Sequence, residues 1–180
     1  SHLGLIEVAG EEATTFLHNQ LTSDVKHLPE DSAQHSAWCS AKGRMVASFL
    51  LFRESDRLQL QLAAALVPAI VRRLRMYVLR SQVTVTDQSA ERCLLGLTGP
   101  QAEQTLADAG LPTPRANLTT AAFADGVVIR LDDRRFEIVV AAAAERDLVE
   151  AGVVPGVDGG EVVAPAVVAV VVLEADAGEG

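Results

Sequence analysis

The sequence predicts an α+β fold made of two successive units, each with a sheet and helices. Some segments alternate apolar and polar residues, as half-buried strands do, and others repeat apolar residues at helical spacing. The same order of strands and helices occurs twice along the chain. With 180 residues, of which 49% are hydrophobic, the chain is long enough to bury a sizeable core.

The first unit has the predicted order strand, helix, three strands, helix, strand. Leucines alternate with glutamines from residue 58 to 62, which is typical of a strand with one solvated face. Pro68 suits the first turn of a helix, and Gly43 can adopt the positive φ of a tight hairpin turn. The predicted elements are a strand at 3–8, a helix opening at 10–12, hairpin strands at 35–40 and 45–53, strands at 58–62 and 82–86, and a helix over 68–78.

The second unit repeats this order more briefly. Its predicted elements are a strand at 93–97, a helix at 100–109, hairpin strands at 126–131 and 136–140, and a helix at 141–151. The order is that of a ferredoxin-like βαββαβ unit, with one additional strand in the first copy. We therefore expect one domain over 1–88 and a second over 89–150. Residues 151–180 consist almost wholly of Val, Ala, Gly, Pro and acids, and we interpret them as a low-complexity segment without an assigned structure.

The charge of the chain limits its partners. A net charge of -9 and a pI near 4.8 argue against an extended nucleic-acid surface, because phosphate binding requires clustered Lys and Arg. Arg72, Arg73, Arg75 and Arg80 form either a local positive patch or an ordinary solvated helix face, and we favour the solvated face. The apolar run 162–173 contains a proline and is shorter than the roughly 20 residues of a membrane-spanning helix, so we predict no membrane segment.

The two cysteines, Cys39 and Cys93, do not have metal-pair spacing and would form at most one disulfide. This low count favours a reducing compartment, and no signal peptide is visible. We therefore predict a cytoplasmic protein. His35 and Cys39 would face one metal ion only on a helix, whereas this segment is expected to be a strand, so no metal site is predicted. Lys42 and Arg44 would activate the Cys39 thiol, but we favour its packing as a small hydrophobe.

Two motifs carry a resemblance to a known family. They are Gln-Leu-Thr-Ser-Asp-Val at 20–25 and Trp-Cys-Ser-Ala-Lys-Gly-Arg at 38–44. Over residues 3–150 the chain resembles YgfZ-type folate-binding proteins, which are relatives of the glycine cleavage T-protein, an aminomethyltransferase. The resemblance implies a fold in which two ferredoxin-like units and a C-terminal barrel surround a folate pocket, and we expect the barrel to be absent from this chain. It also implies tetrahydrofolate as cofactor, iron–sulfur proteins as partners and a role in tRNA modification.

Two departures from the family pattern bear on catalysis. The T-protein carries an acidic pair, one member of which orients the folate, and Ala47 and Ser48 occupy those positions here. The Lys-Gly-Cys-x-x-Gly-Gln-Glu motif of YgfZ-type proteins has no match in the chain. We therefore favour a folate-binding accessory protein, assign no catalytic residue, and leave enzymatic activity open. The alternatives are a folate-dependent aminomethyltransferase and a ferredoxin-like interaction module without a ligand.

The candidate folate-binding residues are Trp38, Lys42, Gly43 and Arg44. The Trp38 ring either stacks on a flat heterocycle such as a pterin or belongs to the core. Lys42 and Arg44 either bind the carboxylates of a folate tail or serve as solvated turn residues. Gly43 shapes the turn that carries them.

Overall fold

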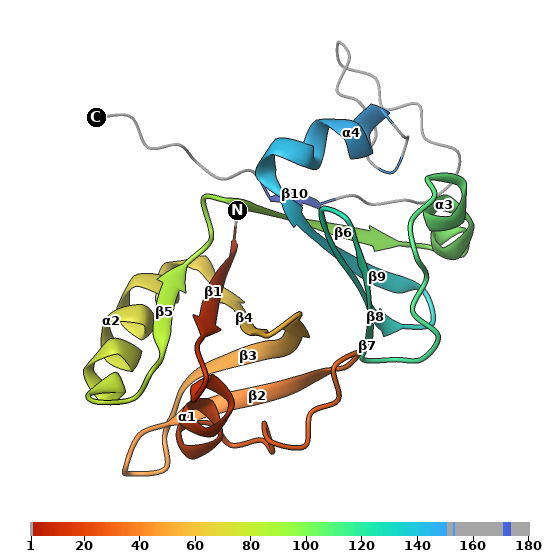
Figure 1. Cartoon of the computed structure of the whole chain (residues 1–180). Coiled ribbons are helices and arrows are strands. Elements are labelled where there is room, and N and C mark those ends of the chain that lie inside the picture. Colours follow the sequence, from red (N-terminus) through yellow and green to blue (C-terminus); the bar gives the residue numbers. More distant parts are fainter. Residues whose placement is uncertain (1, 151–152, 154–170, 174–180) are drawn as a thin grey trace, which may run out of the picture. The chain divides into compact units, whose positions relative to one another are not determined.

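The structure is a computed structural model that describes residues 2–150, 153 and 171–173 (Figure 1). The chain divides into two compact units, Ser1–Ser89 and Ala90–Gly180. Each unit is built on one antiparallel five-stranded sheet with helices packed against it. The predicted α+β fold class with two ferredoxin-like units is confirmed.

In the first unit, the sheet order is β2-β3-β4-β1-β5. Four neighbouring strands of this sheet, β3-β4-β1-β5, have the ferredoxin-like arrangement, and β2 is the additional strand at the edge. The elements are β1 (Leu3–Ala9), α1 (Ala13–Gln20), β2 (Ala33–Cys39), β3 (Met45–Glu54), β4 (Arg57–Ala63), a 3₁₀ turn (Ala64–Leu66), α2 (Val67–Val78) and β5 (Thr84–Asp87).

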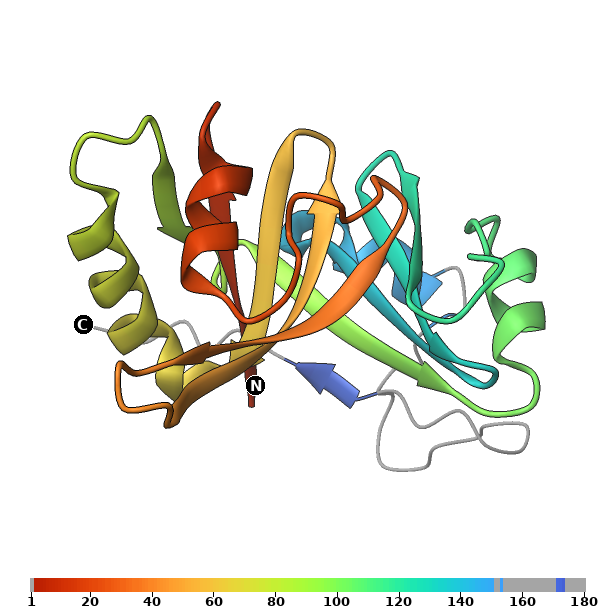
Figure 2. The same ribbon diagram turned by 90° about the horizontal axis from the view of Figure 1, so that it is seen from below.

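Both helices cover the same face of this sheet, as Figure 2 shows for α1 and α2. Apolar residues at every second strand position meet the buried faces of the two helices, so the sheet and helix periodicities both serve one core. The largest fully buried members of this core are Ile6, Leu17, Leu51, Leu58, Leu60, Ile70 and Leu74.

The opposite face of β4 differs from the prediction. Gln59 and Gln61 were expected on a solvated face, but they are only 1% and 6% exposed. The Gln59 amide nitrogen donates hydrogen bonds to the carboxylates of Glu7 and Glu54, at 3.3 and 3.1 Å. These carboxylates satisfy the Gln59 amide nitrogen in place of water, and the alternation of leucine and glutamine gave no sign of them.

A glycine sets the entry to α1. Gly10 has a φ of 118°, and a Cβ atom at this position would lie 2.1 Å from the carbonyl oxygen of Gln82. The Ala13 N–H donates to the Gly10 carbonyl at 3.0 Å, which begins the helix. Only glycine combines this conformation with so close a backbone approach.

The second unit has the same topology, with sheet order β10-β6-β9-β8-β7. Gly99 follows β6 with a φ of 137°, as Gly10 follows β1. The elements are β6 (Arg92–Thr98), α3 (Ala102–Asp108), β7 (Thr119–Phe123), β8 (Gly126–Asp132), β9 (Arg135–Ala141), a 3₁₀ turn (Ala142–Ala144), α4 (Glu145–Glu150) and β10 (Val171–Leu173).

Several predicted boundaries or elements needed correction, among them the segment 151–180, in which Val171–Leu173 form the unpredicted strand β10 and pair with β6. The strand expected at 82–86 is β5, which begins at Thr84 because the Gln82 N–H donates to the Glu12 carboxylate instead of joining the sheet. The helix expected at 141–151 begins only at Glu145, since Ala141 still belongs to β9. The edge strand β7 was not predicted, because its residues Thr-Thr-Ala-Ala-Phe carry a weak alternation signal.

Most of the predicted low-complexity segment, 151–180, lies outside the described residues. Within the described part of the chain, no helix combines the length and apolar character that crossing a bilayer requires.

Candidate functional site

The turn between β2 and β3 presents three of the four predicted site residues. Two backbone hydrogen bonds of 2.8 Å close this turn. The Ser40 N–H donates to the Arg44 carbonyl, and the Gly43 N–H donates to the Ser40 carbonyl. Gly43 has a φ of 72°, which explains the glycine. Lys42, Gly43 and Arg44 are all exposed, and neither basic side chain forms an ion pair with a described residue. The turn therefore carries two unneutralised positive charges.

Trp38 lies at the end of β2 and is only 6% exposed. Its cross-strand partner is Ala47, and both side chains belong to the core beneath the helices. The Tyr77 ring meets it edge-on at a centroid distance of 5.9 Å, and the Arg73 guanidinium carbon lies 5.9 Å from its centroid. Of the two interpretations of Trp38, the structure supports the core residue, since the ring has no open face for stacking.

The motif at 20–25 attaches the connection after α1 to strand β2. The Thr22 N–H donates to the Ala37 carbonyl at 2.9 Å, and the Thr22 hydroxyl accepts from the Ala37 N–H at 3.0 Å. The Ser23 and Ser36 hydroxyls are hydrogen-bonded at 2.7 Å. These hydroxyls give the motif a structural role, because they position the edge strand β2, which carries Trp38.

Asp24, in the same motif, lies between two histidines. Its carboxylate is 2.7 Å from Nδ1 of His27 and 3.5 Å from Nδ1 of His18. The hydrogen bond with the His27 side chain is the main reason that the pKa of Asp24 lies below its ordinary value. The carboxylate thus helps to hold residues 24–27 against α1.

Arg53 secures the same connection from β3, a contact that sequence reasoning missed. Its Nε donates to the Leu28 carbonyl at 3.1 Å, and its Nη2 approaches the Val25 carbonyl and the Thr14 hydroxyl at 3.4 and 3.3 Å. An isolated arginine late in an apolar strand, as Arg53 is in the sequence, is the only signal that pointed to it.

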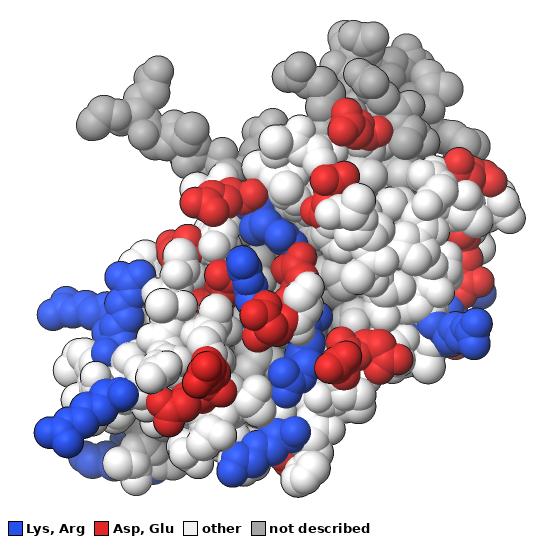
Figure 3. Space-filling model, viewed as in Figure 1, with Lys and Arg blue, Asp and Glu red and all other residues white. Residues whose placement is uncertain are grey.

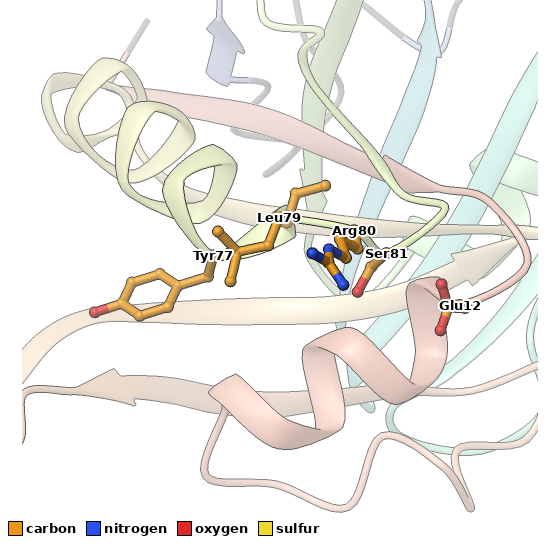
Figure 4. Close-up of a pocket in the computed structure, with 6 residues that line it drawn as sticks. Glu12, Tyr77, Leu79, Arg80 and Ser81 are labelled. Atoms are coloured by element: carbon orange, nitrogen blue, oxygen red, sulfur yellow. The ribbon is translucent and has the colours of Figure 1, made fainter.

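A pocket of about 590 Å³ lies at the C-terminal end of α2, and sequence reasoning did not identify it. Glu12, Tyr77, Val78, Leu79, Arg80 and Ser81 line it. Figure 4 shows Arg80 and Ser81 beside Glu12 from the start of α1, while Tyr77 extends away from them. The lining of the pocket thus combines one carboxylate, one guanidinium, two hydroxyls and apolar surface.

The two cysteines have opposite environments. The prediction that Cys39 packs as a small hydrophobe is wrong, because its side chain is exposed. The pairing of β2 with β3 shifts register between Trp38 and Cys39, so Cys39 lies at a strand end outside the core. Cys93 is 4% exposed and lies in the core of the second unit. The described residues include no group of three or more His, Cys, Asp or Glu placed to hold a metal ion.

The positions that bear on transferase chemistry lie in β3. Ala47 is 4% exposed under the helices, and Ser48 is exposed on the neighbouring position. Between the turn and Glu54 the strand has no carboxylate.

Two consecutive α+β units of this topology place the chain in the fold class of the glycine cleavage aminomethyltransferase T-protein. The chain belongs to the family of the GCVT N-terminal domain, whose sequence profile matches residues 1–118. The predicted resemblance to YgfZ-type proteins and the related aminomethyltransferases is confirmed by individual relatives.

A tRNA-modifying protein YgfZ from Vibrio vulnificus (strain YJ016) is 31% identical over 141 residues, which are 78% of this chain and 42% of the relative. An aminomethyltransferase from Halalkalibacterium halodurans is 32% identical over 133 residues, 72% of this chain and 35% of that protein. The crystal structure of the glycine cleavage system aminomethyltransferase T from Bartonella henselae matches with a TM-score of 0.75 and 28% identity, covering 84% of this chain and 43% of that chain. The chain spans less than half the length of each of these relatives.

Proposed function

We propose that this chain is the folate-binding part of an accessory protein that supports iron–sulfur enzymes and tRNA modification. The family and the YgfZ relatives, whose name describes them as tRNA-modifying, support this proposal. The observation that carries it is the β2–β3 turn, where Lys42 and Arg44 are exposed and have no acidic partner among the described residues. An unneutralised pair of cations is suited to the carboxylates of a folate tail.

The four residues have different roles in this proposal. Arg44 offers a planar fork for bidentate contact with a carboxylate, and Lys42 offers a point charge. Gly43 allows the turn that presents both side chains. Trp38 supports the turn from inside the core rather than stacking on the pterin, since its ring is buried. Bound tetrahydrofolate would supply the one-carbon chemistry; these residues would only hold it.

The test is a calorimetric titration of the 180-residue chain with tetrahydrofolate. We expect Lys42→Ala with Arg44→Ala to weaken binding by about tenfold or more, the scale of lost charge-assisted contacts. The matched control is Arg115→Ala with Arg134→Ala, which removes two exposed arginines from the second unit. Unchanged affinity in the folded Lys42/Arg44 variant would remove the turn from the folate site.

An accessory role is preferred over aminomethyltransferase activity for a reason of position. A carboxylate at residue 47 would lie buried opposite Trp38, and Ala47 stands there instead. Ser48 supplies no charge. Measuring folate-dependent methylene transfer by the unmodified chain and by a variant with acids at both positions tests this preference, because activity of the unmodified chain would support the transferase alternative.

The proposal extends to partners and compartment. Iron–sulfur proteins are the expected partners, as the resemblance implies. A cytoplasmic location agrees with the exposed Cys39 thiol, because exposed thiols persist in reducing compartments. If the folded protein does not bind folate, that result would favour the third alternative, an interaction module without a ligand.

A further inference from the structure

The end of α2 is the most basic part of an acidic chain. Residues 57–86 contain five arginines and no Asp, Glu or Lys, although the whole chain has a net charge of -9. Figure 3 shows basic side chains gathered over α2. Arg57 pairs with Glu7, and Arg75 donates to the Val85 carbonyl at 2.9 and 2.7 Å. Arg72 and Arg80 are exposed and bind no described residue, so their charges are free to meet a partner.

Exposed apolar side chains lie among these arginines. Met76 is 68% exposed, Tyr77 51% and Leu79 87%, which makes them three of the five large hydrophobic residues exposed in the described part of the chain. Residues 72 and 76, and residues 73 and 77, are one helical turn apart and share the outer face of α2. Arginine, methionine and tyrosine are enriched in protein–protein interfaces, and residues 72–81 contain none of the depleted types Lys, Asp and Glu. Glu12, the carboxylate in the lining of the pocket, accepts a hydrogen bond from the Gln82 N–H at 2.7 Å.

Leu79 has a backbone conformation that its packing does not explain. It terminates α2 with a φ of 45° and a ψ of -102°, a region that is strained for a residue with a Cβ atom. Glycine has no Cβ atom and adopts a positive φ without this strain. The strain directs a leucine side chain into solvent at the edge of the 590 Å³ pocket, where it contributes nothing to the core.

We propose that the outer face of α2 and the pocket at its C-terminal end, residues 72–81, form a docking site for an acidic segment of a partner protein. The arginines meet the acidic side chains of that segment, and one of its apolar side chains lies against Tyr77 and Leu79 in the pocket. A protein fits better than a nucleic acid, because Met76 and Leu79 offer no stacking surface and Tyr77 is the only aromatic residue exposed there. The site does not depend on folate binding.

The probe is a fluorescein-labelled peptide, Glu-Glu-Asp-Leu-Phe-Glu-Asp-Glu, titrated into the whole 180-residue chain and followed by anisotropy. We expect saturable binding that weakens with salt, since exposed charges contribute to it. Arg72→Glu with Arg80→Glu should weaken binding by about tenfold or more. The matched control, Arg115→Glu with Arg134→Glu, changes the net charge equally in the second unit and should stay within about twofold of the unmodified chain.

The apolar half of the proposal has its own test. Leu79→Gly removes the side chain and relieves the strained backbone, so the protein stays folded while peptide binding falls by about fivefold. A peptide with Ser in place of Leu and Phe keeps the same charge and should also bind about fivefold more weakly.

Three results would overturn the docking site. The first is no peptide binding at concentrations up to about 1 mM. The second is equal binding by the Arg72/Arg80 variant and the unmodified chain. The third is that a single-stranded RNA with the same charge as the peptide binds more tightly than the peptide, and that the Arg72/Arg80 variant loses this RNA binding. That result would make this face a nucleic-acid site.

Discussion

The rings of Trp38 and Tyr77 meet edge to face, with centroids 5.9 Å apart and planes inclined at 75°. Trp38 belongs to the edge strand β2 and Tyr77 to the last turn of α2, so this contact connects the hairpin that carries the basic turn to the helix that ends in the pocket. Tyr77 is half exposed, whereas Trp38 is buried. The tyrosine therefore shields the tryptophan from solvent.

Tyr77→Ala should destabilise the first unit and expose Trp38. An edge-to-face pair contributes about 1 kcal/mol beyond the area it buries, so the free energy of unfolding should fall by about 1–2 kcal/mol. Trp38 is the only tryptophan, and its emission should shift to the red and become more accessible to acrylamide. Tyr77→Phe is the control, since it keeps the ring. Emission and stability unchanged in Tyr77→Ala would show that the contact does not shield Trp38.

Leu79→Gly should raise the free energy of unfolding by about 1 kcal/mol, because glycine adopts the positive φ without a Cβ penalty and this gain exceeds the entropy it adds to the unfolded chain. Urea unfolding measures the change. Leu79→Ala shortens the same side chain but keeps the Cβ atom, so it should give no comparable gain. A stabilisation by both variants would point to the exposed side chain rather than to the backbone.

Gly10→Ala should be strongly destabilising, by about 3 kcal/mol. The added Cβ would meet the Gln82 carbonyl oxygen at 2.1 Å, and alanine tolerates a φ of 118° poorly. Gly96→Ala is the matched control, because a Cβ at Gly96 in β6 has nothing within 4 Å. Thermal unfolding gives the melting temperature of each variant. Similar melting temperatures would contradict the close approach of Gly10 to the Gln82 carbonyl oxygen.

Acid should weaken the attachment of residues 24–27 through Asp24. Its pKa is lowered in the folded protein, chiefly by the hydrogen bond with His27, so its contribution to stability is present above the unfolded carboxyl pKa of 3.8 and is lost as the pH falls through the lower folded value. Unfolding midpoints measured between pH 6 and about pH 3 should fall less steeply in Asp24→Asn than in the unmodified chain. Parallel slopes would exclude Asp24 as a contributor.

Periodicity predicted most of the fold because local burial patterns depend on which side of an element faces the core. The leucines of β4 and the buried face of α2 repeat with the periods of a strand and a helix, and both elements form within a residue or two of the prediction. β7 escaped prediction because its short, alanine-containing sequence lacks that contrast. The environment of Gln59 escaped because its partners, Glu7 and Glu54, are contributed by other strands.

The candidate site also contains residues whose environment the sequence predicted and one whose environment it did not. The turn residues Lys42, Gly43 and Arg44 were predictable, since a glycine flanked by charged residues between two strands gives a solvated hairpin whatever surrounds it. Whether Trp38 faces a ligand or the core was not predictable, because that depends on Tyr77 and Arg73, about 35 residues further along the chain.

The sequence by itself determined the α+β class, the two repeated units and the basic turn, because these depend on interactions between neighbours in the chain. Only the tertiary structure decided that Trp38 is covered by α2, that Cys39 is exposed, and that Glu12 joins residues 77–81 in one pocket. Each of these depends on side chains distant in sequence that folding brings together, and local pattern carries no information about such pairs.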